Sequence, residues 1–245
     1  MLAIIGGSGL NQFEGLAHVQ RKTVHTPYGD TSAALSFGRI GKSEVVFLAR
    51  HGEGHTLMPH RVNYRANIWA LKQEGAREVV SVATVGGIRK DFVPGSLVVP
   101  DQIIDYTWGR ASTFFDGPGD PVTHIDFTQP YSAALRARII DAARGCGEPI
   151  AMRGVYAATQ GPRLESAAEI DRLERDGAGL VGMTGMPEAA LAREAGLDYA
   201  AIAVVVNHAA GRGDSAHGVS LERLDAVLAQ AMVRVHRILQ ALCGR

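Results

Sequence analysis

The stretch Val45-Val46-Phe47-Leu48-Ala49-Arg50-His51-Gly52 is an apolar run that ends in two side chains able to bind an anion. Its pattern predicts a buried strand that delivers Arg50 and His51 into a glycine-broken turn. A guanidinium offers a planar fork of donors that fits phosphate oxygens, and an imidazole adds a donor that can change its protonation state. The same two residues could instead pair with a carboxylate and cap a turn, so both interpretations stay open here.

Other apolar runs in the chain indicate a sheet built around that strand. Residues 2–5 and 79–85 each run into a pair of glycines, and 199–206 is nearly continuous, as expected of a central strand. Residues 21–48 have the turn signals of antiparallel strands. Helical patterns separate these runs, at 59–75, 131–145, 166 onward, 187–196 and 220 onward. We therefore predict an α/β fold with a mixed central β-sheet flanked by helices. No linker or repeat divides the chain, so residues 1–245 are predicted to form a single domain.

Composition limits the kinds of partner that the chain can have. Its 245 residues include 25 Lys plus Arg and 25 Asp plus Glu, and this balance argues against nucleic acid or an anionic membrane as a partner. The N-terminus lacks the pattern of a signal peptide, and no apolar run approaches the ~18 residues of a membrane span. The two cysteines form no C-x-x-C pair. We predict a soluble, cytoplasmic protein.

Two further sequence features were weighed as ligand sites. The loop Gly6–Leu10 follows the first strand, and its amides and the Ser8 hydroxyl could face an anion. It fails the dinucleotide fingerprint, because Gln12 stands where the third glycine belongs, so a tight turn remains an alternative. His51, His55 and His60 are interrupted by glycines and a proline, which argues against a helical metal motif. No metal and no cofactor are predicted.

Polar residues follow several of the predicted strands. Residues 159–165 come between a strand and a helix whose start has a capping-box pattern at Ser166 and Glu169. Met183-Thr184 and Asn207-His208 also lie just beyond apolar strands. Open α/β sheets place their ligands where strand ends meet. The segment 107–130 is long and irregular, which is typical of functional or interface loops.

Three of these stretches together resemble a known family. Gly6–Leu10, Ala49–Gly52 and Val62–Leu71 are similar to the trimeric purine nucleoside phosphorylase family, above all to its 5′-methylthioadenosine phosphorylase branch. Gly161-Pro162-Arg163 and 182–188 extend the resemblance, which runs from residue 2 to about 240. It implies a pentosyltransferase that uses phosphate to split a nucleoside into a free base and a pentose 1-phosphate. It also implies a homotrimer, with phosphate as co-substrate and no cofactor.

The resemblance also assigns roles to individual residues. The phosphate contacts that it implies fall on Ser8, Arg50, His51, Ala83, Thr84 and Thr184. It puts Met183 against the ribose and Leu164, in place of the family's usual Phe, against the purine. His51 and Asn207 are the expected catalytic residues, and His208 lies beside them in the expected substrate-binding stretch.

Two positions bear on which base the site would accept. The methylthioadenosine branch has two Asp residues where this chain has Asn207 and Ala209, and the Asn amide can donate to N7 or O6 of a purine. Glu165 stands where the inosine/guanosine branch also has Glu and the methylthioadenosine branch has Ser. A carboxylate there can accept N1–H of a 6-oxopurine, whereas adenine has only a lone pair at N1. Unpaired buried groups can discriminate by ~10⁴-fold, so we expect a 6-oxopurine.

The residues that match the family's 5′ pocket favour a substrate with an apolar 5′ substituent. Leu221 stands where the inosine/guanosine branch has a His for the 5′-hydroxyl, although plain helix packing is an alternative role. His124 resembles the residue that a neighbouring subunit contributes there. We therefore expect 5′-methylthioinosine as substrate, with hypoxanthine and 5-methylthioribose 1-phosphate as products. A general inosine/guanosine phosphorylase, a methylthioadenosine phosphorylase that tolerates Asn207, and a nucleoside-binding protein without turnover remain alternatives.

Overall fold

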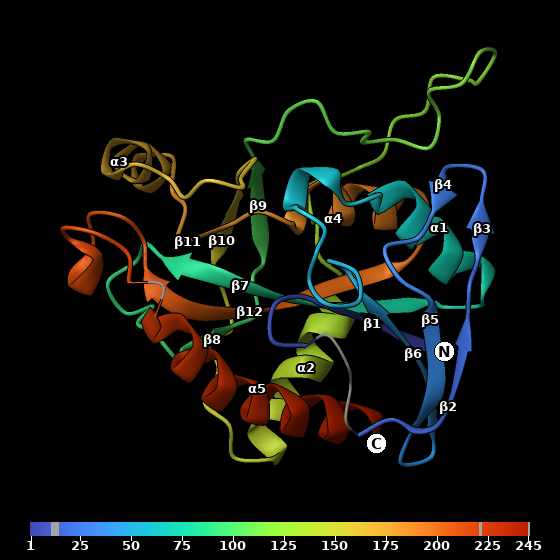
Figure 1. The fold of residues 1–245 in the computed structure, drawn as a ribbon, viewed down its shortest axis with the longest axis horizontal. Coiled ribbons are helices and arrows are strands. Elements are labelled where there is room, and N and C mark those ends of the chain that lie inside the picture. Colours follow the sequence, from blue (N-terminus) through green and yellow to red (C-terminus); the bar gives the residue numbers. More distant parts are fainter. Residues whose placement is uncertain (11–14, 221, 245) are drawn as a thin grey trace.

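The computed structural model describes residues 1–10, 15–220 and 222–244, and it has one large sheet with helices against both faces (Figure 1). The strands of this sheet are β1 (Leu2–Gly6), β2 (Ala17–Lys22), β5 (Leu35–Ile40), β6 (Ser43–Ala49), β7 (Glu78–Gly87), β8 (Leu97–Val98), β9 (Gln102–Asp105), β10 (Val155–Ala158), β11 (Leu180–Gly182) and β12 (Asp198–His208). A small hairpin, β3 (His25–Thr26) with β4 (Gly29–Asp30), stands apart from it.

The sheet combines parallel and antiparallel pairing, as predicted. Its order is β2-β5-β6-β1-β7-β11-β10-β9, and β12 lies along β7 and also pairs with β8. The central strands β6, β1, β7 and β12 are parallel to one another, whereas β2, β5 and β6 form an antiparallel meander at one edge. The predicted α/β fold with a mixed central sheet is therefore confirmed.

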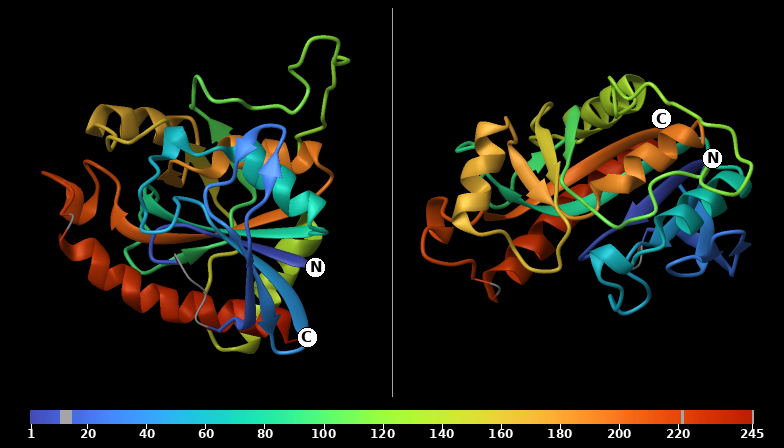
Figure 2. Two further views of the ribbon diagram at one scale, coloured as in Figure 1. Left: turned by 45° about the vertical axis from the view of Figure 1, so that its right-hand side comes forward. Right: turned by 90° about the horizontal axis from the view of Figure 1, so that it is seen from above.

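Two pairs of helices cover the two faces of the sheet. On one face lie α1 (Tyr64–Gln73) and α4 (Gly185–Glu194), and on the other lie α2 (Ala133–Gly145) and α5 (Glu222–Cys243) (Figures 1 and 2). Successive residues of the central strands alternate between these layers, so that Ile5 packs with the first pair and Ile4 with the second. The fifth helix, α3 (Ala167–Arg175), covers the end of the sheet near β10 and β11 through Ile170 and Leu173.

Local signals in the sequence account for the helix starts. Ser166 and Glu169 form the predicted capping box of α3, with both reciprocal hydrogen bonds present. Helix α1 begins at Tyr64, later than the predicted start near Pro59, because the 3-10 turn η1 (Pro59–Arg61) precedes it and Asn63 caps it. A second 3-10 turn, η2 (Gly213–Ser215), follows β12.

Parallel pairing brings the carboxyl ends of β1, β6, β7 and β12 to one edge of the sheet. The amide of Arg50 donates to the Gly6 carbonyl over 2.9 Å, which joins the glycine loop after β1 to the turn after β6. In β12 a register shift between Val205 and Asn207 marks a β-bulge against β7. A bulge redirects the side chains beside it, and here it lies at the same edge.

The irregular segment predicted at 107–130 is present, since no helix or strand occurs between β9 and α2 within fully described residues. Figure 1 shows it as the long green excursion above the sheet. It exposes large apolar side chains, among them Trp108 and Val122, which are 71% and 85% exposed. That exposure is consistent with the interface role predicted for this segment.

Candidate functional site

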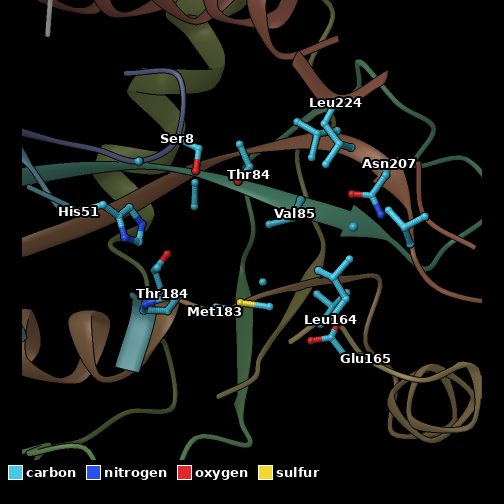
Figure 3. A pocket seen from close by; sticks show the side chains of 18 of the residues that line it. Ser8, His51, Thr84, Val85, Leu164, Glu165, Met183, Thr184, Asn207 and Leu224 are labelled. Atoms are coloured by element: carbon cyan, nitrogen blue, oxygen red, sulfur yellow. The ribbon is translucent and has the colours of Figure 1, made fainter. Parts of the chain in front are cut away.

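A cavity of about 270 Å³ opens at the carboxyl ends of the central strands. Figure 3 shows its two ends, which we call the inner end and the outer end. The inner end is formed by Ser8, Arg50, His51, Thr84 and Thr184, and the outer end by Leu164, Glu165, Asn207 and Ala209. Met183 and Val85 lie between them (Figure 3). The strand ends thus meet at one site, as the sequence predicts.

Arg50 is the most deeply buried charged group of the inner end, with no exposed surface. Its Nε and Nη2 donate to the two carboxylate oxygens of Glu188 at 2.7 and 3.0 Å. Nη2 also donates to the Ser81 hydroxyl and Nη1 to the Val82 carbonyl. Burial by itself would lower the pKa of Arg50, but the Glu188 carboxylate raises it above its ordinary value. The Arg50 guanidinium therefore stays charged, and the paired hydrogen bonds to Glu188 fix its orientation.

These bonds change the role expected of Arg50. We expected its fork of donors to face a phosphate, yet the fork faces Glu188. Four of its five N–H donors are engaged, which leaves one hydrogen on Nη1 without a partner among the described residues. That nitrogen lies beside Gly7, where an added Cβ would be 2.9 Å from it. Arg50 can therefore offer an anion a single hydrogen bond at the glycine loop.

His51 is held as a neutral side chain that can accept a proton. Its Nδ1 lies 2.8 Å from the Leu57 carbonyl, and because a carbonyl only accepts, Nδ1 must carry the hydrogen. Burial, and next the charge of Arg50, lower the pKa of His51 to about 4. Its ring packs against His55 with centroids 4.5 Å apart. Nε2 is then an unprotonated nitrogen, the one that is left for a ligand.

Three hydroxyl groups complete the inner end. Ser8 lies in the loop after β1, and its Oγ is 3.4 Å from Nε2 of His55. Thr84 comes from β7 and Thr184 from the turn that starts α4, where its side chain makes no capping hydrogen bond to the helix. The Thr184 hydroxyl makes its hydrogen bond to Tyr156 instead, and the residue lines the cavity, where this hydroxyl can also accept from a ligand. Hydroxyls, one guanidinium hydrogen and a neutral imidazole make a compact set of donors and acceptors suited to a protonated oxyanion.

At the outer end the β-bulge of β12 decides what faces the cavity. Neighbouring residues of a regular strand point to opposite faces, yet Val206 and Asn207 both line the cavity. The register shift at this place explains it. Asn207 donates through Nδ2 to the His208 carbonyl over 2.6 Å. Its second amide hydrogen and its Oδ1 remain for a bound molecule.

Glu165 and Asn207 both line the outer end, and Leu164 lies between them in the view of Figure 3. Oε1 of Glu165 accepts a hydrogen bond of 2.6 Å from the Thr159 hydroxyl. Beside it, Leu164 is 45% exposed and forms an apolar edge of the opening. An amide and a carboxylate in one opening can together bind a flat heterocycle whose edge has acceptor atoms as well as an N–H donor.

The structure brings most of the expected site residues together in this cavity: Ser8, Arg50, His51, Ala83, Thr84, Leu164, Glu165, Met183, Thr184, Asn207 and Ala209 all line it. His208 does not belong to this lining. Its ring packs against Gly213, and its Nδ1 accepts a weak hydrogen bond of 3.4 Å from the amide of Asp214. The reason is the alternation of side chains after the bulge, which turns His208 away from the side that Asn207 faces.

Two other expected residues lie elsewhere. His124 is exposed on the 107–130 segment and is not among the residues that line the cavity. Leu221 lies outside the described residues. Three cavity residues that the sequence did not single out as site residues, Val206, Val219 and Leu224, add an apolar wall. Leu224 could be recognised only as part of the apolar face of the last helix, which does not separate core contacts from cavity contacts.

Two kinds of feature are absent from the described part of the chain. No group of three or more His, Cys, Asp or Glu residues there is placed to hold a metal ion. Within the same residues, no helix has both the length and the apolar character needed to cross a membrane.

Comparison with known proteins finds several similar chains. A chain from Pseudomonas syringae named probable S-methyl-5′-thioinosine phosphorylase is 53% identical over 233 residues, which are 95% of this chain and 94% of the relative. One of the same name from Xanthomonas campestris is 56% identical over 87% of this chain and 86% of its own. A 6-oxopurine nucleoside phosphorylase from Pyrococcus furiosus is 46% identical over 86% of this chain and 80% of its own.

A solved structure of a related enzyme has the same fold. Methylthioadenosine phosphorylase from Schistosoma mansoni in complex with adenine superposes with a TM-score of 0.95 at 32% identity, covering 99% of this chain and 90% of that one. The model of the phosphorylase superfamily matches residues 1–243. This match, together with the shared fold, confirms the resemblance on which the sequence analysis relied, and the chain belongs to the phosphorylase superfamily.

Proposed function

We propose that this chain catalyses the phosphorolysis of S-methyl-5′-thioinosine to hypoxanthine and 5-methylthioribose 1-phosphate. The observation that carries the proposal is the make-up of the outer end, where the Glu165 carboxylate and the Asn207 amide line the same opening. The relatives from Xanthomonas and Pseudomonas, which are more than half identical to this chain, support the same substrate.

Phosphate would bind at the inner end, against the hydroxyls of Ser8, Thr84 and Thr184 and the free Nη1 hydrogen of Arg50. A phosphate oxygen forms the new bond to C1′ while the bond from C1′ to N9 breaks. The electron pair of the broken bond passes to the purine. Monohydrogen phosphate must give up its proton, which the departing base finally takes. His51 presents an unprotonated Nε2, so it is suited to accept a hydrogen bond from the hydroxyl of the phosphate while another phosphate oxygen attacks C1′.

The base would leave from the outer end with negative charge developing on its ring. The free amide hydrogen of Asn207 can bind N7 or O6, where that charge gathers, and so stabilise the transition state more than the ground state. Glu165 would accept N1–H of hypoxanthine. With adenine, the same carboxylate would meet a lone pair, and the two acceptors would repel.

The 5′ substituent would meet an apolar wall. Val206, Val219 and Leu224 line the cavity on the side of α5, and a methylthio group fits such a surface better than a hydroxyl, which would lose its hydrogen bonds to water there. This wall favours methylthioinosine over inosine. The Pyrococcus relative supports inosine-type substrates as the second candidate, and the base end described above would serve both.

Assembly of the enzyme is a further part of this proposal. A homotrimer would let the exposed segment 107–130, with His124, cover the opening of a neighbouring subunit. A cytoplasmic location remains a prediction from the sequence. Light scattering of the purified protein tests the trimer, and a monomeric mass at assay concentrations would contradict it.

The function itself is tested by product analysis with purified enzyme. Methylthioinosine, inosine and methylthioadenosine are each incubated with and without phosphate, and free base and sugar phosphate are measured by chromatography and ³¹P NMR. We expect phosphate-dependent release of hypoxanthine with one equivalent of sugar phosphate. Equal release without phosphate would indicate a hydrolase, and binding without release would indicate a nucleoside-binding protein.

A further inference from the structure

The Thr159 hydroxyl lies directly behind the carboxylate that faces the base. Thr159 follows β10 and is absent from the residues that line the central cavity. Its Oγ1 is 2.6 Å from Oε1 of Glu165 and 3.3 Å from the Gly182 carbonyl. Gly182 already accepts the amide hydrogen of Thr159 at 2.8 Å, and a hydroxyl has a single hydrogen to donate. The shorter contact therefore identifies Glu165 as the acceptor.

The backbone that carries this hydroxyl is held from the other side by Arg110. Its Nη2 donates to the carbonyls of Thr159 and Gln160 at 3.3 and 2.8 Å, and its Nε donates to the Gln160 side chain. Nη1 donates to the Met183 carbonyl at 2.8 Å. Arg110 thus ties the loop behind the base end to the loop that supplies Met183. Thr159 cannot move without breaking several of these bonds.

Glu165 has a competing environment on its far side. It borders a second, outer hollow, whose lining includes Arg163 and Arg172 and also Thr159. Arg163 pairs with Glu169 at 2.7 Å, and Arg172 lies 3.8 Å from Asp176, so both guanidinium groups stay near this hollow. After the larger effects of Glu169, the negative charge of Glu165 already raises the pKa of Arg163, so a carboxylate free to rotate would be drawn toward this arginine. The bond from Thr159 opposes that rotation.

We infer that Thr159 is a positioning residue for base selection, which fixes the Glu165 carboxylate by occupying Oε1 and leaves Oε2 for N1–H of the base. This inference rests on the proposed function, because it assumes that Glu165 selects the base. Thr159 acts only through Glu165 and touches no substrate. Loss of its hydroxyl should leave phosphate binding unchanged and weaken the preference for 6-oxopurines.

The test compares Thr159→Val, which keeps the shape and loses the donor, with Thr159→Ser, which keeps the donor. For each variant, kcat/KM is measured for methylthioinosine and methylthioadenosine. In the valine variant, the ratio of kcat/KM for methylthioinosine over methylthioadenosine should fall about ten- to hundredfold, the effect of losing a hydrogen bond to a charged group. The serine variant should keep the wild-type ratio. KM for phosphate should stay within about twofold, and the melting temperature should change little, since Thr159 is only half buried.

A double-mutant cycle separates this role from general damage. In a Glu165→Gln background, Thr159→Val should leave the ratio unchanged, because the group through which it acts is gone. A wild-type enzyme without preference for methylthioinosine would overturn the proposed function. A wild-type enzyme with that preference, combined with a valine variant that keeps it, would overturn the role of Thr159 alone. If the valine variant folds poorly, Thr159→Ala in the same cycle decides the same question.

Discussion

The inner and outer ends of the cavity are built in different ways. The inner end comes from ends of parallel strands and from buried side chains, since Arg50, His51 and Thr184 are 0%, 6% and 6% exposed. The outer end comes mostly from a loop and a bulge, and its Leu164 is 45% exposed. A side chain such as Leu164 can change with little effect on the core, whereas Ala209 at the same end is buried in a core cluster. The comparison suggests that the rigid end carries the reaction and the adaptable end carries the choice of substrate.

The largest effect should follow from removing Glu188, which tests the rigidity of the inner end. Glu188→Ala leaves the buried charge of Arg50 unpaired, and we expect the free energy of unfolding to fall by about 3–5 kcal/mol. Denaturant unfolding measures it. Glu53→Ala, which removes an exposed partner of Arg21, is the control and should cost less than about 1 kcal/mol. Equal losses in both variants would show that the inner end is no more rigid than the surface.

The second effect concerns pH and the neutral state of His51. Its folded pKa of about 4 lies below the ~6.5 of an unfolded histidine, so the unfolded chain takes up a proton that the folded one does not. Stability from this residue is therefore full above pH ~6.5 and is lost as pH falls toward 4, by up to about 3 kcal/mol.

The pH-dependent stability that His51 contributes should disappear in His51→Asn, whose amide can still donate to the Leu57 carbonyl. Unfolding curves between pH about 7 and about 4 compare this variant with the wild type and with His217→Asn, which changes an exposed histidine. Identical pH dependence in all three proteins would refute the assignment of this component to His51.

A third prediction moves to the outer end and concerns selectivity. Asn207→Asp combined with Ala209→Asp supplies carboxyl groups where an adenine N7 needs a proton donor. We expect the ratio of kcat/KM for methylthioadenosine over methylthioinosine to rise about ten- to hundredfold. His208→Asp, which adds a carboxylate beside the cavity but outside its lining, is the matched control. An unchanged ratio in the double variant would mean that these two positions do not read the base.

The smallest effect is expected at the apolar wall. Leu224→Ala removes part of the surface that would contact the methylthio group, and the preference for methylthioinosine over inosine should fall by about tenfold. Val233→Ala shortens an exposed apolar side chain on the same helix, and it should leave this preference intact. A larger loss of inosine activity than of methylthioinosine activity in Leu224→Ala would contradict the placement of the 5′ group.

The predictability of the site from sequence follows the same division. Apolar runs that end in glycine or in polar residues predict the central strands, because the burial of a strand depends on its own apolar residues. The capping box at Ser166 is likewise a local signal. The convergence of Ser8, His51 and Asn207 could be expected because parallel strands end at one edge. Thr184 follows β11, which runs antiparallel to β7, so its place at this edge does not follow from that rule.

Features that depend on distant partners could not be predicted. The fork of Arg50 turns to Glu188, which is 138 residues away in the chain. The bulge at Val206, which sets Asn207 toward the cavity and His208 away from it, depends on register with β7. Arg110 lies in a segment without periodicity, and only the folded chain reveals the carbonyls that surround it.

The central claim is that the outer end selects a 6-oxopurine with an apolar 5′ group, and a competition assay tests it most directly. Methylthioinosine, inosine and methylthioadenosine are mixed in equal amounts with excess phosphate and wild-type enzyme. The initial rates of disappearance of the three nucleosides then give the ratios of kcat/KM in one vessel. The account predicts that methylthioinosine is consumed first, inosine next and methylthioadenosine last. Faster consumption of methylthioadenosine than of methylthioinosine would contradict it.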